Sequence, residues 1–174
     1  MSIAIRDARD GDIPRIAEIY AFHVERDIGS FELEAPGAGE MARRYADNQA
    51  KGYPYLVAQS CAEVVGYAYA SAYRSRPAYR HTVEDSVYID AAWSRRGIGS
   101  ALLRALIARC ESGGYRQMIA IIGGSQNAAS IALHSAMGFE RAGMLAAVGR
   151  KFDRWLDTVL MQRALGAGAT TAPE

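Results

Sequence analysis

In the stretch Val87-Tyr-Ile-Asp-Ala-Ala-Trp-Ser-Arg-Arg-Gly-Ile-Gly-Ser-Ala-Leu-Leu103, an apolar strand pattern runs into a helix pattern through a turn that contains two glycines. The N-terminus of a helix has free backbone N–H groups and the positive end of the helix dipole, and glycine allows a ligand to approach the backbone closely. Arg95 and Arg96 add positive charge beside these groups. The stretch therefore indicates either a phosphate or diphosphate site or a glycine-containing turn that only redirects the chain.

The periodicity on either side of this turn predicts alternating strands and helices. Upstream, it predicts a helix that begins near Asp10, a weaker helix over Glu40–Asn48, and strands over Ile3–Arg6, Tyr55–Gln59, Val64–Tyr73 and Val83–Ile89. Downstream, it predicts helices over Gly97–Ser112 and Gln126–Met137, and strands over Gln117–Ile122, Met144–Val148 and Trp155–Gln162. This order of elements is typical of an α/β domain with a mixed sheet.

The composition is that of one ordinary globular domain. The chain has 174 residues, of which 22% are charged, and a formal net charge of +1. We expect a single domain over residues 1–165 and a disordered tail over residues 166–174, because the tail is small, polar and ends near a proline. A charge near zero gives no electrostatic basis for binding nucleic acid or an anionic membrane, so neither is expected as a partner.

The sequence gives no signal for export, a membrane span or a metal site. The first residues are charged and lack the apolar core of a secretory signal, and no window approaches the ~18 apolar residues that a membrane span needs. Cys61 and Cys110 have no metal-like spacing, and we expect two reduced, buried thiols. These observations favour a cytoplasmic protein without a bound metal ion.

A second polar pattern lies on the predicted helix over Gln126–Met137. Asn127 and His134 are seven residues apart, so they share one helix face about 10 Å apart along the axis, and Ser130 lies between them. The helix thus presents a carboxamide, a hydroxyl and an imidazole in a line. A single histidine is more often structural than functional, and we interpret His23 on the first helix as structural.

With both segments considered, the sequence resembles the GCN5-related N-acetyltransferase (GNAT) superfamily. Members of that family carry (Q/R)-x-x-G-x-(G/A) between a strand and a helix, and Ser94-Arg-Arg-Gly-Ile-Gly99 matches it with Ser in the first position. Asn127 and Gly138-Phe139 match a later segment, in which His134 stands where the family has Tyr. The resemblance covers about Ile3 to Gln162. Three segments are similar to the branch that acetylates phosphinothricin, methionine sulfoximine and methionine sulfone, namely Thr82–Tyr88, Ser130–His134 and Gly149–Asp157.

The resemblance implies a fold, a cofactor and an assembly. The fold is a seven-stranded mixed β-sheet, splayed at its centre and flanked by helices, with acetyl-CoA in the split. The backbone groups of Val87, Tyr88 and Ile89 are implied to pair with the pantetheine arm. Asn127 and Ser130 of the later helix are implied to contact the cofactor. The diphosphate is implied to lie on N–H groups of the turn, Arg95, Arg96, Gly97, Ile98, Gly99 and Ser100, with Arg95 or Arg96 replacing the missing Gln or Arg. A homodimer is also implied, with Lys151–Trp155 as a candidate shared edge.

Acetyl transfer to an amine requires a neutral nitrogen, so a base must remove a proton from the ammonium group. Glu84 is the candidate, because it alternates with Ser86 and Tyr88 on one side of its strand and burial there would raise its pKa; the alternative is a surface carboxylate. His134 is a candidate to protonate or stabilise the CoA thiolate, or to act as a second base. N–H groups near Tyr88–Ile89 are candidates to stabilise an oxyanion. Direct attack in a ternary complex is favoured, because neither cysteine lies in a motif with histidine.

The acceptor, a small amino-acid-like molecule, is predicted to bind around Glu84 and Ser86. Arg74 and Arg76 come shortly before the strand of Glu84 and can bind a carboxylate, and Tyr79 can form a wall. The alternative interpretation of this stretch is a solvated basic loop. Phe31 lies in the first long loop, either as part of the substrate wall or as an apolar plug beneath the loop.

Three functions remain open from the sequence. The leading hypothesis is an N-acetyltransferase that acts on the α-amino group of a glutamate- or methionine-like analogue. A peptide or ribosomal-protein N-terminal acetyltransferase would have an open groove without a carboxylate-binding arginine pair. A non-catalytic acetyl-CoA-binding module would keep the turn over Arg95–Ser100 but would not need Glu84 and His134.

Overall fold

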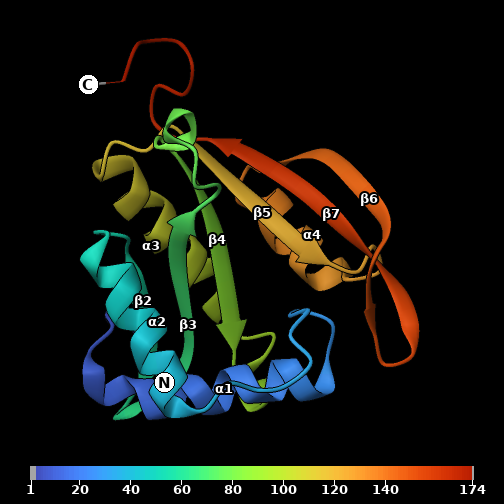
Figure 1. Cartoon of the computed structure of the whole chain (residues 1–174). Coiled ribbons are helices and arrows are strands. Elements are labelled where there is room, and N and C mark those ends of the chain that lie inside the picture. The colour runs from blue at the N-terminus through green and yellow to red at the C-terminus, as the bar shows by residue number, and fades with distance from the viewer. Residues whose placement is uncertain (1–2, 174) are drawn as a thin grey trace.

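The computed structural model describes residues 3–173 and contains seven strands and four α-helices in that part of the chain (Figure 1). The helices are α1 (Ile13–Arg26), α2 (Ala38–Ala50), α3 (Ile98–Ser112) and α4 (Ala128–Ala136). The strands are β1 (Ile3–Asp7), β2 (Tyr55–Ser60), β3 (Glu63–Ala72), β4 (Thr82–Ile89), β5 (Gln117–Gly123), β6 (Glu140–Lys151) and β7 (Arg154–Ala164). The order of elements predicted from the sequence is confirmed. The final hairpin is longer than its apolar pattern suggests, because β6 is mostly exposed and carries no alternating pattern.

The seven strands form one sheet in the order β1-β2-β3-β4-β5-β7-β6. The paired strands are antiparallel except for β4 and β5, which are parallel. The α3 crossover between β4 and β5 makes this parallel pair possible, because parallel neighbours need a long connection. The seven-stranded mixed sheet implied by the resemblance is therefore confirmed.

The sheet opens at its centre, where the parallel pair separates. Residues Thr82–Asp85 of β4 pair with Gln117–Ala120 of β5, and the pairing stops there although both strands continue. In Figure 1, β5, β7 and β6 lean away from β1–β4 below this point. In the described part of the chain, the second half of β4, Ser86–Ile89, therefore has a sheet neighbour only on the β3 side.

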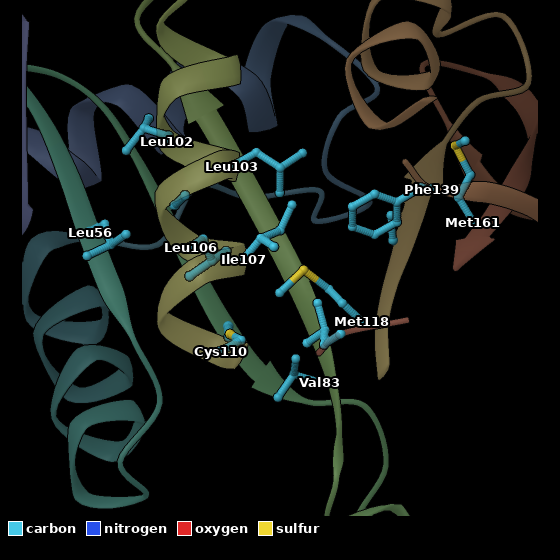
Figure 2. Close-up of a cluster of buried hydrophobic side chains, with 14 of the residues drawn as sticks. Leu56, Val83, Leu102, Leu103, Leu106, Ile107, Cys110, Met118, Phe139 and Met161 are labelled. Carbon is cyan, nitrogen blue, oxygen red and sulfur yellow. The ribbon is translucent and has the colours of Figure 1, made fainter. Parts of the chain in front are cut away.

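Each face of the sheet carries its own apolar core. Side chains alternate along a strand, so Leu56 of β2 faces the core around α3, while Tyr55 and Val57 face α1 and α2. Figure 2 shows the core around α3, in which a row of α3 side chains packs against one face of the sheet. These side chains are Leu102, Leu103, Leu106 and Ile107. Each such side chain stabilises the fold by roughly 1.5–3 kcal/mol. This packing fixes α3, and with it the direction in which its N-terminus points.

The structure corrects one expectation about the cysteines. Cys110 of α3 is buried and unpaired as predicted, but Cys61 is exposed, because it lies in the tight turn between β2 and β3 with a positive φ of 54°.

The end of the chain forms turns over residues 166–173, and the Arg116 guanidinium donates to the Thr171 hydroxyl and the Ala172 carbonyl. Disorder of this tail and the single domain remain predictions. In residues 3–173, no helix is long and apolar enough to cross a membrane.

Candidate active site

A cleft of about 740 Å³ occupies the opening between β4 and β5. Its walls come from the second half of β4, the N-terminus of α3, the end of β5, α4 and the loop after α1. The cleft brings together most of the residues predicted from the sequence: Phe31, Glu84, Ser86, Val87, Tyr88, Ile89, Arg95, Gly97, Ile98, Gly99, Ser100, Asn127, Ser130 and His134. Residues far apart in the chain thus line one space, as the resemblance implies.

The N-terminus of α3 forms one end of this cleft. Gly97 is its N-cap with a φ of 78°, a left-handed conformation that glycine adopts without strain, and no side chain in residues 3–173 caps the helix. The first N–H groups of α3 are therefore free for a ligand. Arg95 also lines the cleft, whereas the Arg96 guanidinium stacks over Trp93 at 4.7 Å and donates to the Ala92 carbonyl. Free amides beside one arginine fit a diphosphate, with Arg95 the better placed of the two arginines.

The backbone of β4 offers hydrogen-bonding groups on the open side. The Asp90 N–H donates to the Val65 carbonyl, which fixes the alternation of the ladder between β3 and β4. Because the groups of alternate residues point to opposite sides, the N–H groups of Val87 and Ile89 face the opening, and those of Tyr88 face β3. The Ile89 carbonyl accepts a hydrogen bond of 2.8 Å from His23 Nε2. An extended amide chain in the opening could therefore pair with Val87 and with the N–H of Ile89.

Glu84 is a half-buried carboxylate in the same cleft. Burial, and secondarily the charge of Asp85, raise its pKa to about 7. No hydrogen bond within residues 3–173 holds its carboxylate in the charged form. Glu84 pairs in register with Ser71 of β3, on the sheet face that α1 and α2 cover. A carboxylate that titrates near neutral pH can accept a proton from an ammonium group.

His134 lies on the other face of the sheet, and sequence reasoning missed its partner. Its Nε2 is 3.0 Å from Oδ2 of Asp85, and its Nδ1 is 2.8 Å from the Ser130 carbonyl oxygen. His134 and Asp85 are only 4% and 6% exposed. One feature of the sequence could have indicated this partner. Asp85 is a carboxylate on the otherwise apolar side of β4, and a buried charge requires a partner. Both ring nitrogens are thus engaged by the protein itself.

Asn127 and Ser130 begin α4 beside the cleft. The Asn127 side-chain oxygen accepts from the Ser130 N–H at 3.2 Å, and its amide nitrogen donates to the Gly123 carbonyl at 3.4 Å. Asn127 is therefore the N-cap of α4 as well as a wall of the cleft. Ser130 lies one turn before His134, which explains its close contact with the ring.

Phe31 lies in the loop after α1, which crosses the opening of the sheet. Its ring packs so closely against Gly149 of β6 that a Cβ at this position would collide with it. Lys151 donates to the carbonyls of Asp27 and Ser30, at 3.0 and 2.6 Å. His23 pairs with Asp27 at 2.6 Å, so it is a structural histidine, as predicted, and also part of the cleft wall. The loop is thus tied to both halves of the sheet.

The basic stretch after β3 lies outside this cleft. Arg74, Arg76 and Tyr79 line a separate surface depression of about 350 Å³, and the Arg74 guanidinium lies 5.2 Å from the Tyr73 ring centroid and 5.9 Å from that of Tyr79. The structure therefore does not bring these three residues together with Glu84.

Across residues 3–173, no group of three or more His, Cys, Asp or Glu side chains could hold a metal ion.

Comparisons with known proteins agree with this geometry. Residues 5–160 match the family described as the acetyltransferase (GNAT) domain. The chain is 54% identical over 170 residues to a phosphinothricin N-acetyltransferase of Alcaligenes faecalis, with 98% of this chain and 86% of that protein covered. It is 44% identical over 166 residues to an L-methionine sulfoximine/L-methionine sulfone acetyltransferase of Pseudomonas aeruginosa, covering 93% and 94%. Among solved structures, a phosphinothricin acetyltransferase of Sinorhizobium meliloti in complex with acetyl-CoA is similar with a TM-score of 0.97 and 47% identity, covering 100% and 94%.

Proposed function

This chain belongs to the GNAT acetyltransferase family, and we propose that it acetylates the α-amino group of a small amino-acid analogue of the phosphinothricin, methionine sulfoximine or methionine sulfone type. As a member of this family it is an N-acetyltransferase that uses acetyl-CoA. The acceptor class is supported by the names of relatives that are 54% and 44% identical over nearly the whole chain. The fold alone would not support it, since one fold hosts many acceptors.

The observation that carries the proposal is the position of Glu84 beside the cofactor-binding elements. Its carboxylate lines the same cleft as the free N–H groups of α3, and its pKa of about 7 suits a base that works at neutral pH. We propose that Glu84 takes one proton from the acceptor ammonium, directly or through a water molecule. The nitrogen lone pair is then free to attack.

Acetyl-CoA supplies the activated thioester when it is bound. We propose that N–H groups of Gly97, Ile98, Gly99 and Ser100 hold its diphosphate together with Arg95, and that Val87 and Ile89 align the pantetheine arm. Arg96 is a weaker candidate, because it stacks on Trp93. Asn127 and Ser130 are proposed to contact the pantetheine. The Ile89 N–H points toward the opening and is our candidate donor to the developing oxyanion.

We propose that Phe31 and Ser86 form part of the acceptor wall, since both line the cleft with Glu84. Arg74, Arg76 and Tyr79 remain candidates for the acceptor carboxylate. They follow β3, whose residue Ser71 is the register partner of Glu84, so they lie at the same end of the sheet.

A thiol-release assay with acetyl-CoA tests the proposed function. Methionine sulfone, methionine sulfoximine and phosphinothricin should each be compared with a peptide that has a free N-terminal alanine. We expect turnover with at least one amino-acid analogue and none above background with the peptide. Turnover with the peptide alone would favour the N-terminal acetyltransferase, and binding of acetyl-CoA without any turnover would favour the non-catalytic module.

We propose direct attack in a ternary complex rather than an acyl-enzyme. Burial, and then the charges of Asp85 and Glu111, raise the pKa of the Cys110 thiol to about 12, so it stays protonated. Cys61 lines a different surface pocket, with Arg15 and Trp93. A Cys61→Ser, Cys110→Ser double variant should therefore retain turnover, and initial-rate plots should intersect. Parallel plots together with loss of turnover would contradict direct attack.

We propose that the active form is a homodimer. The hairpin of β6 and β7 exposes apolar side chains that a second copy would cover, and they are Met144, Leu145, Val148, Phe152 and Trp155. A net charge of +1 offers little repulsion between two copies. Sedimentation velocity should give twice the mass of 18.9 kDa, and Trp155→Glu should shift the protein toward monomer. A monomer at all concentrations would contradict the dimer.

We also propose a cytoplasmic location and a detoxifying role. Free, exposed Cys61 suits a reducing compartment. Acetylation removes the positive charge of the α-amino group, which an analogue of glutamate or methionine needs in order to imitate the natural amino acid.

A further inference from the structure

The contact between Asp85 and His134 defines the protonation state of the imidazole. The Ser130 carbonyl can only accept, so Nδ1 at 2.8 Å from it carries a hydrogen. Nε2 faces the Oδ2 atom of the Asp85 carboxylate at 3.0 Å. If Nε2 carried no proton, its lone pair would face a lone pair of this oxygen in a buried space. A proton on Nε2 removes this repulsion and makes both contacts donating. The ring is then an imidazolium.

The energetic balance points the same way. Burial by itself lowers the pKa of His134, but the hydrogen bond and charge of Asp85, together with the Ser130 carbonyl, outweigh it, so the net shift is upward. The second carboxylate oxygen of Asp85, Oδ1, has no hydrogen-bond partner in the described residues. Within residues 3–173, the one side-chain hydrogen bond of Asp85 is thus the contact with His134.

This pair lies where the sheet opens. Asp85 is the last residue of β4 that is paired with β5, opposite Ala120. His134 lies near the end of α4, the helix whose first turn carries Asn127 and Ser130. The Phe139 ring packs edge-on against the His134 imidazole, with the two ring centroids 5.0 Å apart. This contact helps to hold the imidazole in place. The contact of Asp85 with His134 therefore joins α4, one wall of the cleft, to β4, the opposite wall, at the point where β4 separates from β5.

We propose that Asp85 is a positioning residue that keeps His134 as an imidazolium and, through it, holds α4 at the distance from β4 that the cofactor requires. The inference rests on the proposed function, and it goes beyond it by giving His134 a fixed charge and a tether in place of a role as base. In this arrangement His134 cannot accept the proton of the acceptor amine, because both ring nitrogens already carry a hydrogen and donate it to Asp85 and Ser130.

The titratable neighbours of the pair do not compete for this proton. Cys110 of α3 stays a thiol near neutral pH, because burial and the charge of Asp85 raise its pKa to about 12. Glu84 is adjacent in β4 but projects to the other face, and the charge of Asp85 acts on it by raising its pKa. The pKa of each of these two groups, like that of His134, is raised by the charge of Asp85.

Nitrogen-15 NMR of the histidine rings tests the charge without measuring activity. The chain has three histidines, and His134→Asn identifies the signals of His134. At about pH 7.5, one unit above the ordinary histidine pKa, we expect both nitrogens of His134 to be protonated in the native protein. In Asp85→Asn we expect a neutral ring with hydrogen on Nδ1, because the amide can donate to Nε2. A neutral ring in the native protein at this pH would overturn the proposal.

Kinetics of two variants test the tether. Asp85→Asn keeps a hydrogen bond to the ring and should retain most of the affinity for acetyl-CoA. Asp85→Ala removes the bond, and the KM for acetyl-CoA should rise about tenfold with a smaller change in kcat. Cys110→Ala is the matched control, because it removes a buried side chain near Asp85 without touching the ring; it should lower stability but leave this KM unchanged.

The outcomes separate this inference from the proposed function. Equal KM values for acetyl-CoA in native protein and a folded Asp85→Ala variant would overturn the tether, even if turnover confirms the N-acetyltransferase. A low-pH limb that is lost in His134→Asn but kept in Glu84→Gln would also overturn it, because His134 would then be the base. If Asp85→Ala does not fold, the NMR result for the native protein and the KM of Asp85→Asn decide the matter.

Discussion

Glu84 and Asp85 are neighbours in β4, and their carboxylates lie on opposite faces of the sheet. Asp85 is buried with His134 and Cys110 on the face that α3 and α4 cover. Glu84 lies on the face of Ser71 and Tyr69, toward α1 and α2, and its carboxylate reaches the cleft. Strand alternation thus places Glu84, with its raised pKa, on one face and the contact between Asp85 and His134 on the other.

Glu84→Gln tests the base directly. The amide has nearly the same shape but cannot accept the proton, so kcat should fall by about 10²–10⁴-fold, the usual contribution of a general base. The acetyl-CoA dissociation constant from calorimetry should be unchanged, because Glu84 does not contact the free N–H groups of α3. An unchanged kcat would remove Glu84 from the mechanism.

The pH dependence follows from the pKa of the same group. Glu84 must be ionised to accept a proton, and burial together with Asp85 raises its pKa to about 7. Below this pH the carboxylate is protonated, so kcat/KM should fall tenfold per unit as the pH decreases, in addition to the loss that comes from protonation of the acceptor. The value of kcat at saturating acceptor isolates the enzyme group. A kcat limb centred near the ordinary glutamate value of about 4.3 would show that the carboxylate is solvated in the working enzyme.

The raised pKa also predicts a dependence of stability on pH. Between the ordinary glutamate pKa of about 4.3 and the raised pKa of about 7, the folded protein binds more protons at Glu84 than the unfolded chain does. Its contribution to the free energy of unfolding therefore decreases as the pH rises through this window and stays reduced above it. Glu84→Gln removes the penalty, so its Tm should exceed that of the native protein at about pH 8, with a smaller gain at about pH 4.5. Equal gains at both pH values would mean that the substitution acts through packing.

Gly97→Ala tests the diphosphate site, and Gly52→Ala is its matched control. Gly97 and Gly52 have φ values of 78° and 74°, and a Cβ would meet no atom within 4 Å at either position. Both variants should therefore lose a similar stability of about 1 kcal/mol from left-handed strain. Gly97→Ala alone should weaken acetyl-CoA binding in calorimetry, since only Gly97 sets the direction of the free N–H groups of α3. A similar loss of affinity in both variants would mean that strain, and not position, is responsible.

The elements could be predicted because they are encoded locally, and the residues of the cleft were predicted mainly through the resemblance to the GNAT family. Residues 87–103 contain the strand, the turn and the start of α3, and their periodicity and glycines are visible without any tertiary contact. The partner of His134 is 49 residues away, and periodicity placed Asp85 on an apolar face without saying which side chain would meet it. The position of Arg74 and Arg76 outside the cleft depends on the course of a loop, which has no periodicity to read.

The tether between Lys151 and the loop after α1 is another long-range contact, and it yields the last prediction. The ammonium group donates to the Asp27 and Ser30 carbonyls across 124 and 121 residues, and Phe31 follows directly in the cleft wall. Burial lowers the pKa of Lys151, against the opposing charges of Asp27 and Glu32, so this lysine loses part of the hydration that an exposed one keeps. Without the two hydrogen bonds, the loop would sample positions in which Phe31 leaves the cleft.

Lys151→Met keeps the length of the side chain and removes both hydrogen bonds. The KM for the acceptor should rise about three- to tenfold, while the KM for acetyl-CoA should stay near its native value, because the N–H groups of α3 are not attached to this loop. Lys51→Met, at an exposed lysine after α2, is the control and should change neither constant. Hydrogen exchange should show faster exchange over residues 27–31 in Lys151→Met only. Faster exchange without a rise in the acceptor KM would show that Phe31 fills space beneath the loop and does not contact the acceptor.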